Sequence, residues 1–205
     1  MDRWAEACAA LSAADPAMAA TIATSGPCRL ARRRTPGGTF AALAEAIVYQ
    51  QLAGAAAAAI HGRFAALYGG RPTAAAVAAT PPASLRSVGL SANKAASIRD
   101  LAARTLDGTV RTTGWRRMSD DEIVDRLEAV RGIGPWTAHM FLIFQLNRPD
   151  VWPTGDLGVR AGFARIQGLE TLPTPRALAA AGDAYRPWRT IAAWYCWRAM
   201  DGPFP

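Results

Sequence analysis

The residues best suited to bind a ligand lie between Ser119 and Pro135. Ser119-Asp-Asp-Glu122 has the pattern of a capping box, and the helix that it begins stops at Gly132-Ile-Gly134, where Pro135 opens a second, apolar helix. Glycines at such a turn allow positive φ and let another molecule approach the backbone. Exposed amides at the start of a helix favour an anion. The longer pattern LxxVxGIGxxTA therefore predicts a helix-hairpin-helix that holds a DNA phosphate, with a plain turn between helices as the alternative.

Ligands for a metal ion are scarce in this sequence. The three cysteines, Cys8, Cys28 and Cys196, are scattered, and the two histidines, His61 and His139, form no HExxH pattern. Their spacing does not resemble that of a disulfide framework or of a zinc or iron–sulfur ligand set. We expect no catalytic metal and no organic cofactor.

The charge is strongly positive. The formal net charge is +7, and Lys94 is the only lysine among the basic residues. A basic domain suits a polyanionic partner such as nucleic acid, although arginine-rich composition can also reflect the base composition of a gene. Any chemistry that requires an amine has a single candidate, Lys94.

Helical patterns run through almost the whole chain, and no stretch alternates with the period of a strand. We expect an all-α fold, with a basic linker over 29–38. Four further helices are predicted over Pro16 to Gly26, Thr39 to Gly69, Thr73 to Pro81 and Ser91 to Asp107, the second of them as one long helix. Two more are predicted to begin after Thr174-Pro175 and at about Arg186.

The length of 205 residues fits one unit, 1–205, made of two lobes that share a core. No apolar run approaches the roughly 18 residues needed to span a bilayer, and the N-terminal residues lack the apolar core of a signal peptide. We therefore expect a monomer that is soluble and cytoplasmic, without a membrane partner.

The region after the hairpin carries a family resemblance. The segment VWPTGDLGVRAG places Asp156 twenty positions after Trp136. The order of hairpin, apolar helix, short loop and Gly-Asp resembles the helix-hairpin-helix DNA glycosylases. Three other segments are most similar to the 3-methyladenine DNA glycosylase II branch: AIVYQQLAG at 46–54, VGLSANKAASI at 88–98 and YRPWRTIAAWYCWR at 185–198.

The resemblance covers roughly residues 15–200 and implies a two-lobed fold with the active site in the cleft between the lobes. One lobe is expected over 40–145, ending in the helix-hairpin-helix at 119–146. The other combines 1–39 with 146–205. The minimal form, without the N-terminal β-rich domain of some relatives, is expected.

The resemblance implies that Asp156 is the catalytic carboxylate. Breaking an N-glycosidic bond builds positive charge on the sugar, and a nearby carboxylate stabilises that cation and can orient water. The alternative is that Asp156 only caps the helix beginning at Leu157, and both roles are compatible.

Trp136 separates two reaction types within the family. Members that also cut the DNA backbone have a lysine at this place, which forms a Schiff base with the sugar. Tryptophan here disfavours lyase activity, and its electron-rich face suits a cationic, alkylated base. Tyr49 and Trp152 are further candidates for the base pocket, with core packing as the alternative.

The resemblance also implies DNA contacts. Base flipping leaves a gap, and Gln51 is the expected wedge, with Leu52 beside it. Lys94 and Arg160 are candidate phosphate contacts, or solvated charges. The expected DNA-binding residues of the hairpin are Gly132, Ile133, Gly134 and Thr137. The Ile133 side chain is expected to point inward and to tie the hairpin to the core. A monovalent cation could bind backbone carbonyls near Val130 and Gly132.

These residues predict a monofunctional DNA glycosylase that removes alkylated purines, of the 3-methyladenine and 7-methylguanine type, from double-stranded DNA and leaves an abasic site. Two alternatives stay open. One is a non-catalytic helix-hairpin-helix protein that binds DNA structures, and the other is a bifunctional glycosylase/lyase for oxidised bases.

Overall fold

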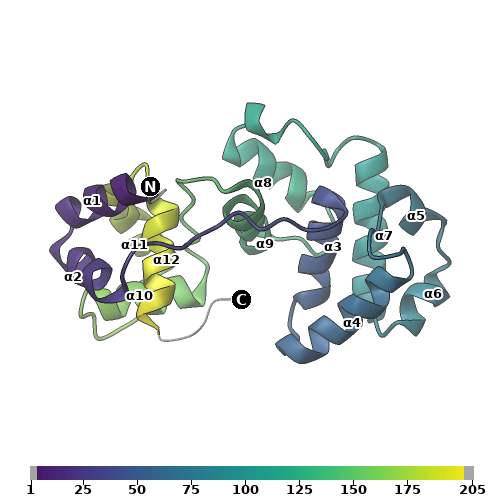
Figure 1. The fold of residues 1–205 in the computed structure, drawn as a ribbon, viewed down its shortest axis with the longest axis horizontal. Coiled ribbons are helices and arrows are strands. Elements are labelled where there is room, and N and C mark those ends of the chain that lie inside the picture. Colours follow the sequence, from purple (N-terminus) through teal and green to yellow (C-terminus); the bar gives the residue numbers. More distant parts are fainter. Residues whose placement is uncertain (1–3, 201–205) are drawn as a thin grey trace. The chain divides into compact units, whose positions relative to one another are not determined.

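The computed structural model describes residues 4–200, which contain helices and no strand. This confirms the all-α prediction. The chain divides into two compact units, one formed by Arg33–Phe141 and the other by the residues up to Arg32 together with those from Leu142 onward (Figure 1). Within residues 4–200, none of the helices has the length and apolar character needed to cross a bilayer.

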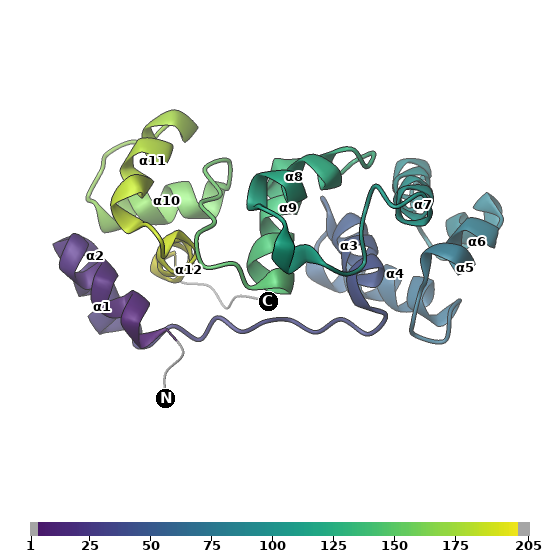
Figure 2. The same ribbon diagram turned by 90° about the horizontal axis from the view of Figure 1, so that it is seen from above.

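The unit Arg33–Phe141 is built around one long helix, α7 (Ala92–Leu106), whose inner face carries the buried Ile98 and Leu101. Ser91 caps α7 by accepting a hydrogen bond from the Lys94 amide. Helix α7 packs against α3 (Gly38–Tyr49) and α5 (Ala74–Ala79), and α3 packs against α4 (Gly54–Ala66) (Figure 2). The unit is completed by α6 (Pro82–Ser87), α8 (Asp120–Glu128) and α9 (Pro135–Met140).

The single helix predicted from Thr39 to Gly69 is wrong. The chain forms α3 and α4 with a break at 50–53, because Gln51 adopts the left-handed conformation with φ of 56° and cannot continue a helix. Most of α3 is buried, whereas α4 buries only Ala57 and Phe64. The N-terminal boundary also differs, since Gly37 caps α3 and Thr39 lies inside it.

The other unit is organised around α12 (Arg189–Ala199), in which every residue from Thr190 to Trp197 is buried. It packs against α10 (Leu157–Ile166), α2 (Pro16–Ser25) and α1 (Ala5–Ala14), with α11 (Pro175–Ala181) completing the unit. The approach of α10 to α12 depends on Gly162, because a Cβ there would lie 1.8 Å from the Cys196 carbonyl oxygen. Burial raises the pKa of the Cys196 thiol far above its ordinary value.

The second hairpin helix also departs from its prediction as one α-helix. Helix α9 ends at Met140, and the chain continues as a π-helical turn over Phe141–Leu146. Such turns change which way the following side chains point and are frequent at functional sites. The turn here directly precedes the loop that leads to Asp156.

Candidate active site

The loop from Asn147 to Asp156 is fastened to the beginning of α12. The Thr190 hydroxyl accepts a hydrogen bond from the Val151 amide at 2.9 Å and donates one to the Arg148 carbonyl at 2.7 Å. The Thr190 amide donates to the Pro149 carbonyl at 3.0 Å. One fully buried threonine therefore fixes the loop backbone at three neighbouring residues.

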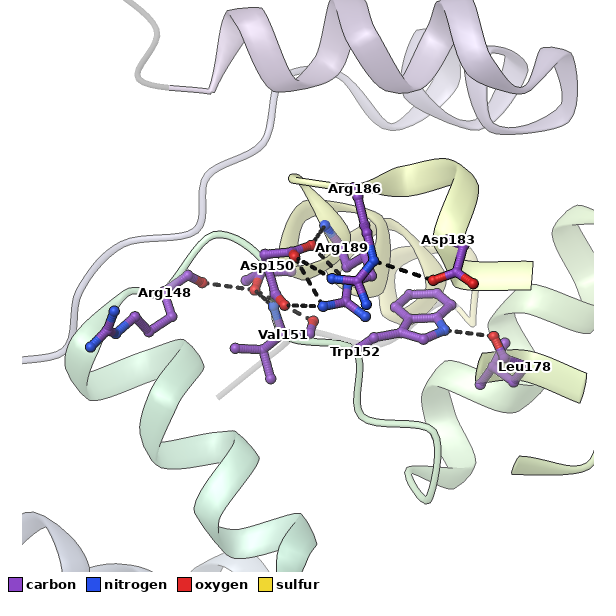
Figure 3. A network of polar contacts seen from close by, with 9 residues as sticks. Arg148, Asp150, Val151, Trp152, Leu178, Asp183, Arg186 and Arg189 are labelled. Carbon is purple, nitrogen blue, oxygen red and sulfur yellow. Dashed lines mark hydrogen bonds and ion pairs between the residues drawn. The ribbon is translucent and has the colours of Figure 1, made fainter. Parts of the chain in front are cut away.

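Asp150 reinforces this attachment through two arginines (Figure 3). Its carboxylate accepts from Arg189 Nε at 2.7 Å and Nη2 at 2.9 Å, and from Arg186 Nη1 at 3.0 Å. Paired guanidinium–carboxylate bonds of this kind are geometrically specific. The loop therefore has both a backbone anchor and a side-chain anchor on the same helix.

Trp152 lies in the core of this unit. Its Nε1 donates to the Leu178 carbonyl at 2.7 Å, and its ring meets Phe163 and Tyr185 edge to face. These contacts are those of a packed core residue, so they favour the packing role that the sequence left open over a place in the base pocket.

Asp156 follows this loop and caps α10. Its Oδ1 accepts hydrogen bonds from the Val159 amide at 2.8 Å and from Trp197 Nε1 at 2.9 Å. The residue is buried, with 8% of its surface exposed. Two donors on the same oxygen fix the carboxylate plane, so the expected cap and a precisely held acid group coexist in one residue.

The ring of Trp197 also has an aromatic neighbour. Phe144, in the π-helical turn, stacks on Trp197 with ring centroids 5.9 Å apart and an interplanar angle of 24°. Gly158 adds a close approach, because a Cβ there would lie 2.9 Å from Trp197 Cδ1. Sequence reasoning missed Trp197 and Phe144. The family-like segment at 185–198 contained Trp197, but nothing in the spacing linked it to Asp156.

The hairpin has the predicted local structure. Ser119 and Glu122 form both hydrogen bonds of the capping box. Gly132 has φ of 77°, and a Cβ there would lie 2.7 Å from Ser97 Oγ, so this position requires glycine. Ile133 is buried, as expected, and Gly134 precedes Pro135 at the start of α9.

The break between α3 and α4 contacts this hairpin. The Gln50 amide nitrogen donates to the Gly132 carbonyl at 2.9 Å and to the hydroxyl of the buried Thr137 at 3.2 Å. Gln51 and Leu52 are exposed on the same loop. Gln50 is a site residue that the sequence did not single out, because its partner lies 82 residues away.

The remaining predicted residues have different surroundings. Trp136 is the second residue of α9 and is half exposed, and Tyr49 ends α3 with its ring edge near His61. Arg160 donates to the Pro173 carbonyl at 2.9 Å, and Lys94 donates to two backbone carbonyls of its own chain. These contacts give both basic residues a structural role besides any contact with phosphate.

Two carbonyls considered for a monovalent cation already accept hydrogen bonds. The Val130 carbonyl accepts from the Ile133 amide at 3.1 Å, and the Gly132 carbonyl accepts from Gln50. Among residues 4–200, no group of three or more histidine, cysteine, aspartate or glutamate side chains could hold a metal ion.

A glycine hairpin in one unit and a buried, helix-capping aspartate in the other are the features expected of a helix-hairpin-helix base-excision protein. The model of the HhH-GPD superfamily, base excision DNA repair proteins, matches residues 44–187. The chain belongs to this superfamily.

Relatives within the superfamily are similar over most of the chain. DNA-3-methyladenine glycosylase 1 of Schizosaccharomyces pombe is 37% identical over 76% of this chain and 70% of its own length. The solved structure of the 3-methyladenine DNA glycosylase of that yeast with abasic DNA has a TM-score of 0.84, at 34% identity, covering 94% of this chain and 95% of that one. A DNA-3-methyladenine glycosidase of Bacillus halodurans has a TM-score of 0.88, at 30% identity, covering 97% and 91%. The resemblance to the alkylation-repair branch is confirmed.

Proposed function

We propose that this protein is a monofunctional DNA glycosylase of base excision repair that hydrolyses the N-glycosidic bond of alkylated purines. Membership of the superfamily and the names of the similar proteins support this function. The single structural observation that carries it is the buried Asp156 carboxylate, held by the Val159 amide and the Trp197 indole. A protein that only bound DNA would have no need for a carboxylate fixed in this way beyond its capping bond.

Asp156 would act on the sugar of the flipped nucleotide. As the bond between C1′ and the base nitrogen breaks, the electron pair leaves with the base and positive charge develops on the sugar. The carboxylate stabilises that charge and orients a water molecule, whose oxygen bonds to C1′ while its proton passes to the carboxylate or to solvent. The alkylated base departs as a neutral molecule, so no strong general acid is required.

Trp136 and Tyr49 would recognise the base. Alkylation of adenine at its 3-position or of guanine at its 7-position makes the base cationic, and an aromatic face attracts a cation. Both side chains are partly exposed, with 49% and 38% of their surface accessible, so both can meet a ligand. Trp152 is left out of this pocket because its donor and its ring are engaged in the core.

The unit Arg33–Phe141 would hold the DNA. The hairpin residues from Gly132 to Gly134 present backbone to a phosphate, and the exposed Gln51, with Leu52, fills the space that the flipped base leaves. Duplex DNA containing damaged bases is the partner, and the expected site of action is the cytoplasm, at the nucleoid if the source is a bacterium. The protein is expected to work as a monomer.

Two observations disfavour a lyase. Trp136 stands where the resemblance places lysine in bifunctional relatives, and the Lys94 ammonium is bound by two carbonyls. Borohydride reduction during turnover should therefore trap no covalent protein–DNA adduct. A trapped adduct would overturn the monofunctional assignment while leaving base removal intact.

Chromatography of bases released from methylated DNA tests the proposal directly. The wild-type protein should release 3-methyladenine or 7-methylguanine, and Asp156→Asn should slow release by about 10²–10³-fold. Asparagine retains the oxygen that caps α10, so the variant should fold and bind duplex DNA as the wild type does. Release at the wild-type rate from the folded variant would refute the catalytic role of Asp156.

A further inference from the structure

The loop at 50–53 has little hydrogen bonding of its own. Gln51 holds the uncommon left-handed conformation, and the Leu52 amide donates to the Tyr49 carbonyl at a long 3.4 Å. Both Gln51 and Leu52 are exposed, so burial does not fix their positions. The conformation of this loop must therefore be imposed by neighbouring elements.

Lys94 is one such neighbour. From the first turn of α7, its Nζ donates to the Val48 carbonyl at 2.6 Å and to the Gln50 carbonyl at 2.7 Å. The last carbonyls of a helix lack partners within the helix and carry partial negative charge, so an ammonium group bridging them stabilises the end of α3. Partial burial lowers the pKa of Lys94.

Gln50 is the second neighbour, and it joins the loop to the hairpin. Its side-chain amide donates to Gly132, the first residue of the Gly-Ile-Gly turn, and to Thr137, in the helix that follows the turn. Helix α7 also supports that turn, because Asp100 Oδ2 accepts from the Arg131 amide at 2.8 Å. The loop and the hairpin thus share one support, the helix that carries Lys94.

We propose that Lys94 and Gln50 are positioning residues that fix the loop 50–53 to α7 and to the hairpin, so that the two segments meet DNA as one preorganised surface. Lys94 acts through the backbone of α3 and not through a phosphate. The part that concerns base release rests on the proposed function, in which Gln51 fills the gap left by the flipped base.

The first test needs no enzymatic activity. Lys94→Met removes the donors at similar length, and Arg86→Met, on the exposed surface of α6, removes the same charge from the same unit. Limited chymotrypsin digestion followed by mass spectrometry should show cleavage after Tyr49 and Leu52 about tenfold faster in Lys94→Met than in the wild type or in Arg86→Met. Cleavage after the exposed Leu106, at the far end of α7, serves as an internal reference and should not change. Equal rates at the loop in all three proteins would overturn the proposal.

The second test separates positioning from phosphate binding. Each phosphate contact changes the slope of log K against log salt concentration by about 0.9 for duplex DNA. Lys94→Met should keep the wild-type slope for undamaged duplex, whereas its single-turnover base release should fall by about tenfold. A slope reduced by about one would assign Lys94 to the DNA backbone and overturn the proposal.

A double-mutant cycle shows whether Lys94 acts through the loop. In a Gln51→Ala background, Lys94→Met or Gln50→Leu should slow base release by no more than about twofold, because the side chain that they position is already gone. A full tenfold additive loss would contradict the proposal. If the wild type releases no alkylated base, the proposed function fails, yet the digestion test still decides whether Lys94 holds the loop.

Discussion

The two units hold their proposed functional residues in opposite ways. Asp156 is buried and receives hydrogen bonds from an indole and an amide of its own unit, and the loop before it is fastened to α12. Gln51 and Leu52 are exposed, and only their backbone neighbours are fixed, through Lys94 and Gln50.

This difference follows from the two tasks. A carboxylate that stabilises a charge in the transition state must be held in one geometry, since electrostatic stabilisation depends on preorganised groups. Side chains that enter a DNA duplex must be accessible, and only the backbone that carries them can be fixed in advance. The unit with Asp156 should therefore be sensitive to packing, and the unit with the hairpin should tolerate added atoms wherever no close contact exists.

The largest expected effect comes from breaking the contact between α10, the helix that Asp156 caps, and α12. Gly162→Ala places a Cβ 1.8 Å from the Cys196 carbonyl oxygen, so α10 and α12 must separate. We expect a loss of about 3 kcal/mol in the free energy of unfolding, measured by urea denaturation. The matched control is Gly62→Ala in the middle of α4, where a Cβ meets no atom within 4 Å and should stabilise the protein by about 0.5–1 kcal/mol. Similar losses in both variants would mean that the loss at Gly162 does not come from its contact with α12.

The next largest effect is expected from a substitution that loosens the loop leading to Asp156. Thr190→Val keeps the shape of the side chain but removes the hydroxyl, leaving the buried Val151 amide without its partner. The cost of such an orphaned donor is about 1–3 kcal/mol, again measurable by urea denaturation. Thr105→Val in α7 is the control, because among the described residues that hydroxyl bonds only to the Leu101 carbonyl of its own helix. A variant at Thr190 as stable as the one at Thr105 would contradict the role of this anchor.

The parts of the site that sequence reasoning found are those defined by neighbouring residues. The capping box at Ser119, the turn at Gly132 and the cap at Asp156 each depend on side chains and amides within a few positions, so the local pattern was sufficient. The partners that fix the geometry are distant, as with Trp197, which lies 41 residues from Asp156, and no spacing rule reports them.

The same reason explains the errors in the fold. The break at 50–53 is contacted by Lys94 and joined through Gln50 to the hairpin, and these partners lie far along the chain, so no local pattern marked it. Helix α1 was not predicted. It is rich in alanine and buries only Ala7 and Leu11, which gives too few apolar residues to define a helical face.

A smaller effect tests the hydrogen bond to Asp156 itself. Trp197→Phe removes the Nε1 donor and keeps an aromatic ring against Phe144, so the carboxylate loses one of the two bonds on Oδ1. We expect about a tenfold slower single-turnover release of base, equivalent to about 1.4 kcal/mol, with unchanged duplex affinity. Trp152→Phe loses the hydrogen bond to the Leu178 carbonyl in the same unit. It should lower the free energy of unfolding about as much as Trp197→Phe does, without slowing the release of base. Equal slowing by both variants would make Trp197 merely structural.

The smallest effect concerns a second carboxylate of the same unit, Asp15, at the start of α2. Burial alone would raise the pKa of Asp15, but hydrogen bonds from the Tyr185 hydroxyl, the Met18 amide and the Gln167 side chain outweigh it and lower the pKa. A carboxyl group with a lowered folded-state pKa contributes stability above its ordinary pKa of 3.8, and this contribution is lost as the pH falls through the folded-state value.

Tyr185→Phe removes the first of these bonds, so the variant should be less stable than the wild type at pH 7. The difference between the two proteins should shrink as the pH falls below the ordinary pKa of aspartate, because without the Tyr185 bond Asp15 takes up its proton at a higher pH in the variant than in the wild type. Urea denaturation at pH 7, 5 and 3 measures both differences. A gap that stayed constant over this range would mean that Tyr185 stabilises the unit by packing alone, and the contrast between fixed carboxylates and the exposed Gln51 and Leu52 would then rest on Asp156 without support from Asp15.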